Sequence, residues 1–283
     1  MAENKLMTQL TPDVLRDLQA TQIEILEEIV RVCDKYHLRY FFIYGTLIGA
    51  IRHKGFIPWD DDLDIGMPRD DYEKFMQVAD KELNEKYYLQ NNQKESQYWL
   101  SFGKVRKNHT LFEEPSVAIM SKDIHKGIFV DIFPFDYVKK NSGLFVHLQF
   151  IFSKAICETM YYKAGVYKER RSLRYRHLNV LLNALSMTKL SNLQRKIASL
   201  QNPKKAEFLA DFNSSRKYLA AIYPIDFFLP VKEGEFAGKT FSIPNDYDTY
   251  LKMVYGDYMK MPKEEERVNH RTIRIVFDTT KEE

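Results

Sequence analysis

Residues 45–65 constrain the fold of this chain more than any other stretch. They begin with Gly45 and Thr46, directly after an aromatic and aliphatic run. They end with four carboxylates in five positions: Asp60, Asp61, Asp62 and Asp64. Alternate side chains of a β-strand share a face, so a strand through Asp-Leu-Asp-Ile directs Asp62 and Asp64 to one side and the apolar residues to the other. Two such carboxylates repel each other unless a cation lies between them, and Mg²⁺ takes oxygen ligands of this kind.

A third carboxylate, Asp131, lies inside the apolar run 127–135, which we expect to be a strand. Burying this carboxylate is costly unless it meets a cation or hydrogen-bond donors. If its strand lies beside the strand of Asp62 and Asp64, three carboxylates converge near the turn that follows Gly45. The backbone N–H groups of such a turn suit a phosphate. The carboxylates suit one or two Mg²⁺ ions, with Mn²⁺ as an alternative.

The apolar periodicity and the turn signals predict an α/β (α+β) protein with a mixed sheet flanked by helices. Besides a helical turn at 46–51, helices are expected at 11–37, 69–83, 144–163, 178–200, 203–222 and 246–255. Strands are expected at 40–44, 62–67, 87–90, 98–106, 116–120 and 127–135, with a hairpin within 230–244. We divide the chain into a catalytic core at 1–140, an additional helical subdomain at 141–225, and a C-terminal segment at 226–283 that completes the active site.

Composition and charge exclude several classes of protein. The chain is 45% hydrophobic and 29% charged, which supports a sizeable core, and its net charge of +3 argues against binding of nucleic acid. Cys33 and Cys157 lie far apart in apolar surroundings, so we expect free thiols in a reducing compartment. Residues 1–10 lack the apolar segment of a signal peptide, and no run reaches the roughly 18 apolar residues of a membrane-spanning helix. We therefore expect a cytoplasmic protein, at most peripheral at the inner face of the plasma membrane.

A Gly-Thr pair, an Asp-x-Asp pair and a third Asp on a later strand resemble the arrangement of the nucleotidyltransferase superfamily. The amino-acid sequence of residues 45–65 is more specific and resembles the signature of the LicD family, to which the fukutin-related proteins also belong. Further matches lie at 104–107, 129–134, 241–247 and 255–262, with His270 after the last. The resemblance covers nearly the whole chain and is weakest across 140–220.

The resemblance implies a nucleotidyltransferase-like fold and transfer of a phosphorylated alcohol, commonly phosphocholine or an alditol phosphate. The donor would be a CDP-activated alcohol such as CDP-choline, and CMP would be released. The acceptor would be a hydroxyl of a cell-surface glycan, such as a lipid-linked glycan, a lipopolysaccharide or a teichoic acid precursor.

The resemblance also implies roles for the acidic residues. Asp62 and Asp64 would be the main metal ligands. Asp131 would be the third carboxylate, as a ligand, as the general base for the acceptor hydroxyl, or as both. Asp60 would orient these ligands without binding the metal itself, and Asp61 would be solvated or structural.

Eight further residues are candidates for substrate binding: Gly45, Thr46, Arg52, His53, Lys104, Arg106, His270 and Arg271. The pair at 45–46 would contact phosphate, or would form a plain turn. The pair at 52–53 would contact phosphate, or would pair with the neighbouring acids. Lys104 and Arg106 would neutralise a diphosphate, or would form a solvated strand face. The pair at 270–271 would close over the donor.

Residues 144–177 combine a long apolar helix with a cluster of arginines. They would form core helices with a basic face exposed to solvent, or a surface that docks on anionic lipid. Two rival functions also remain open at this point. The first is a true nucleotidyltransferase that moves a nucleoside monophosphate to a sugar or small-molecule hydroxyl. The second is a non-catalytic regulator or scaffold on the same fold.

Overall fold

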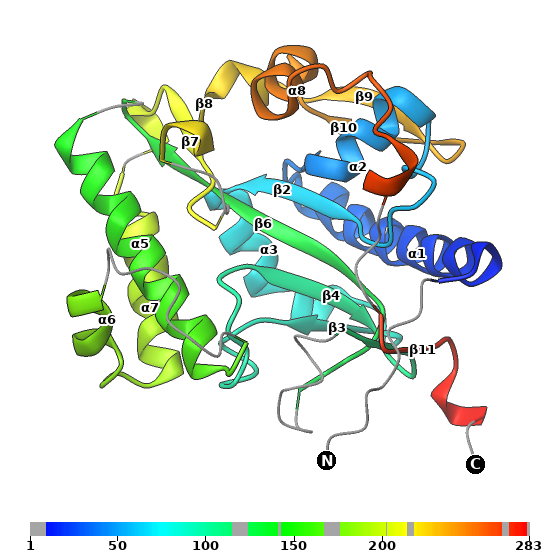
Figure 1. Cartoon of the computed structure of the whole chain (residues 1–283), viewed down its shortest axis with the longest axis horizontal. Helices are drawn as coiled ribbons and strands as arrows, with labels where there is room; N and C mark the ends of the chain where they lie inside the picture. The colour runs from blue at the N-terminus through cyan, green and yellow to red at the C-terminus, as the bar shows by residue number, and fades with distance from the viewer. Residues whose placement is uncertain are drawn as a thin grey trace.

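The computed structural model describes residues 10–114, 124–140, 143–166, 176–201, 203–213, 218–267 and 272–281. A curled mixed sheet runs through its centre in the strand order β1-β2-β6-β4-β3, and β7 and β8 extend it from the far end of β6 (Figure 1). These strands are β1 (Phe41–Phe42), β2 (Asp64–Pro68), β3 (Tyr87–Gln90), β4 (Gly103–Lys107), β6 (Phe129–Val138), β7 (Phe208–Ala210) and β8 (Ile222–Pro224). The sheet is flanked by helices, so the predicted fold class is confirmed.

Strand register places the predicted site residues in one row. Strands β2 and β6 are parallel, with Asp64 opposite Asp131. Strands β4 and β6 are antiparallel, with Lys104 opposite the same Asp131. Residues directly opposite each other on paired strands point to the same face of a sheet. Two acids and one base therefore lie side by side across three adjacent strands.

Helices α1 (Pro12–Tyr36) and α3 (Arg69–Glu82) pack against the sheet and against each other. The start of α1 follows the predicted pattern, because the Thr11 hydroxyl accepts a hydrogen bond from the backbone N–H of Val14 and Pro12 occupies the first turn. The helix ends at His37, which adopts a left-handed backbone conformation with φ of 54°. Its apolar side, which includes Leu18, Ile25 and Ile29, is fully buried in the main core.

The described part of residues 143–201 is largely helical and lies at one end of the sheet (Figure 1). Its helices are α5 (Leu144–Lys163), α6 (Arg176–Leu182) and α7 (Met187–Ala198). The predicted helix at 178–200 is thus two helices, and the helix predicted at 203–222 is wrong. That stretch contains β7, whose three residues pair with β6 and with β8, because long-range strand pairing overrides the local helical pattern. The division of the chain into three segments stays a prediction.

The C-terminal part returns to the core. Strands β9 (Lys232–Phe236) and β10 (Lys239–Ile243) form the predicted hairpin, and α8 (Tyr247–Tyr255) follows, capped by the side chain of Asp246. Strand β11 (Arg274–Val276) pairs with β5 (Leu111–Glu113). The strand predicted at 116–120 lies outside the described residues. Short 3-10 turns occur at Pro203–Lys205, Tyr218–Ala221, Ile225–Phe227, Glu264–Glu266 and Thr279–Lys281.

Within the described ranges, none of the helices combines the length and the apolar character needed to cross a bilayer.

Candidate active site

The row of Asp64, Asp131 and Lys104 is the centre of the site. Lys104 Nζ lies 2.6 Å from Asp131 Oδ1, and both residues are almost completely buried. The same ammonium group lies 3.4 Å from the ring centroid of Phe129, so it also makes a cation–π contact. Asp131 therefore has the cationic partner that a carboxylate in an apolar strand requires.

The carboxylates of the site are crowded. Burial raises the pKa of Asp64 well above its usual value, and the charges of Asp62, Asp131 and Asp60 raise it further, although Lys104 opposes them. Burial also raises the pKa of Asp131 to about 6, against the lowering effect of Lys104. The ammonium group of Lys104 lowers the pKa of both Asp64 and Asp131 but does not cancel the increase, so an additional cation would relieve the repulsion between these acids.

The loop that precedes β2 brings the remaining acids to the site. Asp62 lies before the first residue of β2, so the predicted strand begins two residues too early and strand alternation does not orient this side chain. It is half-buried and lines the same cavity as Asp131. Asp61 is fully buried, which rules out the solvated alternative, and its backbone carbonyl accepts a hydrogen bond of 2.9 Å from Gln22 Nε2.

Gly45 and Thr46 lie in the first turn of α2 (Tyr44–Ile48), which continues into a π-helical turn at Gly49–His53. A Cβ atom at Gly45 would lie 2.6 Å from Oδ2 of Asp60, so glycine at this position lets the Asp60 carboxylate lie directly against the helix. The Thr46 hydroxyl accepts a hydrogen bond of 2.8 Å from the backbone N–H of Asp64 and ties α2 to the first residue of β2. Contact of the Gly-Thr pair with a phosphate stays a prediction.

The basic pair at 52–53 is bound to the C-terminal part of the chain. Arg52 Nη1 donates to the backbone carbonyl of Tyr258 at 2.7 Å, and Arg52 Nε donates to His53 Nε2 at 2.9 Å. Burial lowers the pKa of His53, and the charge of Arg52 lowers it further. A role of this pair in phosphate binding stays a prediction, and His270 and Arg271 lie outside the described residues.

Lys104 and Arg106 are not a solvated strand face, because both are buried. Arg106 Nε donates to Gln90 Oε1 at 2.5 Å, and Nη1 donates to the backbone carbonyl of Gly127 at 2.5 Å. Its guanidinium carbon lies 4.7 Å from the ring centroid of Phe129, on which Lys104 also rests. Burial lowers the pKa of Arg106. The two cations are therefore held in place beside Asp131.

A cavity of about 290 Å³ opens on this arrangement. One part of its wall is charged and consists of Asp61, Asp62, Glu114, Asp131, Lys104 and Arg106. The other part is mainly aromatic and apolar, with Tyr98, Trp99, Leu100, Phe112, Ile124 and Tyr161. Sequence reasoning missed this aromatic wall, because its members come from a loop, from β5 and from α5, and no spacing in the chain links them.

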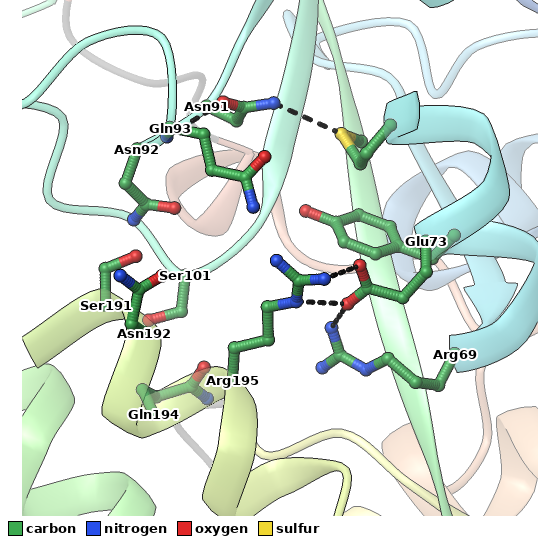
Figure 2. A pocket seen from close by; sticks show the side chains of 12 residues that line it. Arg69, Glu73, Asn91, Asn92, Gln93, Ser101, Ser191, Asn192, Gln194 and Arg195 are labelled. Atoms are coloured by element: carbon green, nitrogen blue, oxygen red, sulfur yellow. Dashed lines mark hydrogen bonds and ion pairs between the residues drawn. The ribbon is translucent and has the colours of Figure 1, made fainter. Parts of the chain in front are cut away.

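A second cavity lies between α3, α7 and the segment before β4 (Figure 2). Its wall consists of amides, hydroxyls and the chain of ion pairs formed by Arg69, Glu73 and Arg195, in which Arg195 Nη2 lies 2.6 Å from Glu73 Oε2. Its volume of about 30 Å³ leaves room for little more than water. Of these two cavities, the one lined by Asp131 and Lys104 is therefore the larger and has room for a substrate.

The three predicted metal ligands supply the oxygen donors that a hard cation prefers. In the part of the chain that the structure describes, no group of three His, Cys, Asp or Glu side chains is close enough to hold an ion as placed. The raised pKa of Asp64, caused partly by Asp62 and Asp131, nevertheless marks a site where a cation would be stabilising. The metal site at Asp62, Asp64 and Asp131 stays a prediction.

Acidic residues in register on adjacent strands, beside a Gly-Thr helix start, define a nucleotidyltransferase-like site. The family described as LicD/FKTN/FKRP, nucleotidyltransferase domain, matches residues 37–163. The chain is also 31% identical to the lipopolysaccharide cholinephosphotransferase LicD of Haemophilus influenzae. The match extends over 269 residues, which are 90% of this chain and 95% of that protein. The chain therefore belongs to the LicD family, which confirms the resemblance read from residues 45–65.

Shorter matches occur with two uncharacterized proteins. One, from Rickettsia typhi, is 35% identical over 69 residues, or 24% of this chain and 22% of that protein. The other, from Rickettsia prowazekii, is 38% identical over 55 residues, or 19% of this chain and 21% of that protein.

Proposed function

We propose that this protein transfers phosphocholine from CDP-choline to a hydroxyl of a cell-surface glycan and releases CMP. The observation that carries the proposal is the row of Asp64, Asp131 and Lys104, of which Asp131 and Lys104 line a cavity of about 290 Å³. The name of its Haemophilus influenzae relative, a lipopolysaccharide cholinephosphotransferase, supports the transferred group and a glycan acceptor.

The reaction joins the acceptor oxygen to the distal phosphorus of the donor and breaks the bond between that phosphorus and the oxygen that leaves with CMP. Lys104 and Arg106 bind the negative charge of the diphosphate. Asp131 accepts the proton of the acceptor hydroxyl as the hydroxyl attacks. One or two Mg²⁺ ions, or Mn²⁺, held by Asp62, Asp64 and Asp131, would neutralise the charge that develops on the phosphate oxygens.

The products of a single incubation distinguish this reaction from its first rival. Purified protein is mixed with CDP-choline, Mg²⁺ and a glycan acceptor, and the products are identified by mass spectrometry. Phosphocholine transfer gives free CMP and a glycan that carries phosphocholine. A cytidylylated sugar with released phosphocholine would instead identify a nucleotidyltransferase. Chelation of the metal with EDTA should stop the reaction, and added Mg²⁺ should restore it.

Two further experiments address the transferred alcohol and the non-catalytic alternative. Thermal unfolding with CDP-choline, CDP-glycerol or CDP-ribitol, each with Mg²⁺, should give the largest stabilisation with CDP-choline. Absence of stabilisation by all three would contradict the CDP-alcohol donor. A scaffold protein would retain its effect in cells after Asp62→Asn and Asp64→Asn, whereas an enzyme would lose it.

The exposed face of α5 supports contact with a membrane surface that carries the acceptor. Its N-terminal half exposes four large apolar side chains, and two exposed lysines precede it: Leu144, Phe145, Leu148, Phe152, Lys139 and Lys140. An apolar stripe beside basic residues suits anionic lipid. The arginines at 170, 171 and 174 lie outside the described residues.

Co-sedimentation with vesicles tests this contact. Binding should be stronger to vesicles that contain phosphatidylglycerol than to pure phosphatidylcholine, and Phe145→Ser with Leu148→Ser should abolish it. Val180→Ser with Leu181→Ser, at exposed positions of α6, is the matched control and should leave it unchanged. If the two double variants lost vesicle binding to the same extent, α5 would not be the membrane-binding element.

A further inference from the structure

Helix α1 carries two glutamines on the side that meets the loop 57–63, which leads into β2 and which we call the acidic loop. Gln22 interrupts the apolar stripe of the helix, because it takes the core position between Leu18 and Ile25. Its side chain is nevertheless fully buried. Gln19 is half-buried and lies three residues earlier, on the same face of the helix. Burying an amide is costly, so the hydrogen bonds of these side chains indicate their role.

Both glutamines bind the backbone of the acidic loop (Figure 1). Gln19 Nε2 donates to the carbonyl of Asp60 at 2.9 Å. Gln22 Nε2 donates to the carbonyl of Asp61 at 2.9 Å. The two acceptors belong to consecutive peptide units, and the second unit ends at the Cα atom of Asp62. Because a peptide unit is planar, a bond to its carbonyl orients the whole unit, so α1 fixes the backbone on both sides of Asp61.

The other end of the acidic loop is held by β6 and α2. The backbone N–H of Asp131 donates to the carbonyl of Leu63 at 2.9 Å. The backbone N–H of Asp64 donates to the Thr46 hydroxyl at 2.8 Å. Asp62 lies between these bonds and those from α1, and it lines the same cavity as Asp131. Anchors on both sides therefore set the position of the backbone from which the Asp62 side chain reaches this cavity.

The acids of this loop need such anchors because they repel their neighbours. The charges of Asp62 and Asp60 act on Asp64, as the raised pKa of that residue shows. Repulsion of this kind favours movement of the loop away from β2. A glutamine opposes the movement through a backbone carbonyl and, being neutral, leaves the charge of the carboxylates available to a cation.

We propose that Gln19 and Gln22 are positioning residues, which hold the acidic loop on α1 so that Asp62 stays at the cavity beside Asp131. The inference rests on the proposed phosphotransfer and deepens it, because it explains how Asp62 is kept in place for that reaction. Neither glutamine lines this cavity, so each acts through a backbone carbonyl of the loop.

Amide exchange in the free protein tests this role without any substrate. Gln22→Met keeps the length and the helix propensity of the side chain but removes the donor. The backbone N–H groups of Asp60 and Asp64 both make hydrogen bonds, so hydrogen–deuterium exchange of a peptide that spans 57–65 reports on the loop. Exchange should be about tenfold faster in Gln22→Met, which is the effect of losing one buried hydrogen bond. The midpoint of urea unfolding should change little, because Met suits the apolar surroundings of this position.

Thr21→Val is the matched control. The Thr21 hydroxyl donates to the carbonyl of Asp17 at 2.9 Å, within α1 itself, so the variant should exchange peptide 57–65 at the wild-type rate. Gln19→Met, at a half-exposed position, carries little risk to the fold. It should accelerate exchange less than Gln22→Met, since water can replace its amide. Wild-type exchange in both glutamine variants, or equal acceleration in Thr21→Val, overturns the proposal.

Turnover separates this role from the proposed reaction. In Gln22→Met the Mg²⁺ concentration for half-maximal CMP release should rise about tenfold, whereas kcat at saturating Mg²⁺ should stay within about twofold of the wild-type value. An unchanged Mg²⁺ requirement overturns the positioning role and leaves the phosphotransfer intact. Absence of CMP release from the wild-type protein contradicts the phosphotransfer, and amide exchange still decides whether the glutamines hold the loop.

Discussion

Strand β6 carries two buried carboxylates five residues apart, and the two are paired in different ways. Asp136 receives two hydrogen bonds from one guanidinium, Arg69 Nε at 2.6 Å and Nη2 at 2.8 Å. Asp131 receives a single ammonium, from Lys104 at 2.6 Å. A forked, bidentate partner fixes the orientation of a carboxylate through two hydrogen bonds, whereas a single ammonium group makes one contact and sets that orientation less strictly. The first pair is suited to stability and the second to catalysis.

The surroundings of the two pairs reinforce this difference. Burial alone would lower the pKa of Arg69, but Asp136 outweighs burial and raises it. Arg69 also contacts Glu73, which binds Arg195 of α7, so the pair belongs to a chain of alternating charges that joins α7 to α3 (Figure 2). Around Asp131, by contrast, burial raises the pKa of the carboxyl group, Lys104 lowers it, and the carboxylates of Asp62 and Glu114 raise it further.

The largest expected effect comes from the pair that we propose to be catalytic. Asp131→Asn or Asp64→Asn should reduce kcat by about 10³-fold, because the proposed proton acceptor or an acid beside it is lost. Asp64→Asn should not lower the free energy of unfolding appreciably, since it removes one of several mutually repelling carboxylates. In Asp131→Asn the same relief is offset in part because the buried Lys104 loses its partner, so the loss of stability should stay well below that of the Asp136 and Arg69 variants. The measurements are CMP release and urea unfolding. Asp13→Asn, at an exposed position of α1, is the control and should change neither quantity.

The distinction between the two pairs would be wrong if Asp131→Asn lowered the free energy of unfolding as much as Asp136→Asn or Arg69→Met. It would also fail if the Asn variants kept full activity, because the carboxylate row would then have no catalytic role.

The structural pair should show the opposite behaviour. Asp136→Asn or Arg69→Met should lower the free energy of unfolding by about 3–5 kcal/mol, because each leaves a buried charge without its partner. The double variant Arg69→Met with Asp136→Leu should recover much of this loss, since both buried charges are then removed. Urea unfolding measures both effects. A loss below about 1 kcal/mol in the single variants would show that this pair is not a structural one.

The smallest expected effect on stability comes from His125, a partly buried histidine. The ring of His125 stacks on Tyr88 at 4.9 Å, and its Nδ1 accepts a hydrogen bond from the backbone N–H of Gly127. Burial lowers the pKa of His125 to about 4, with help from Arg106 and His109. The pKa in the folded protein is therefore below the unfolded value of about 6.5.

Because the folded protein resists protonation of His125, the stability linked to this group is complete above about pH 6.5 and is lost as the pH falls toward 4. Between pH 7 and pH 5 the wild-type protein should lose about 1–2 kcal/mol more than His125→Gln. Unfolding in urea at the two pH values measures this difference. Identical losses in both proteins would mean that His125 is not neutral in the fold.

The parts of the fold that follow from local pattern were predictable. Helix α1 has its cap, its Pro12 and its apolar stripe within one continuous stretch, and the apolar runs around Asp64 and Asp131 identify two buried strands. Once both strands are known, their adjacency brings the two acids together. The separate position of Asp62 was not predictable, because the local pattern does not tell where β2 begins.

Features that depend on residues distant in the sequence could not be predicted from the local pattern. Arg106 is buried because Gln90 and the carbonyl of Gly127 accept its hydrogen bonds, and neither partner is indicated by the residues around it. Strand β7 is three residues long and owes its conformation to pairing with β6 and β8. The aromatic wall likewise depends on how α5 packs against the loop before β4.

The close approach of Gly45 to Asp60 sets a boundary for engineering this enzyme. Because a Cβ atom there would meet Oδ2 of Asp60 at 2.6 Å, alanine at position 45 would force the Asp60 carboxylate to move. The charge that Asp60 places near Asp64 would then shift without a change of any acidic residue. Engineering of this protein should therefore vary the wall of the cavity and leave position 45 untouched.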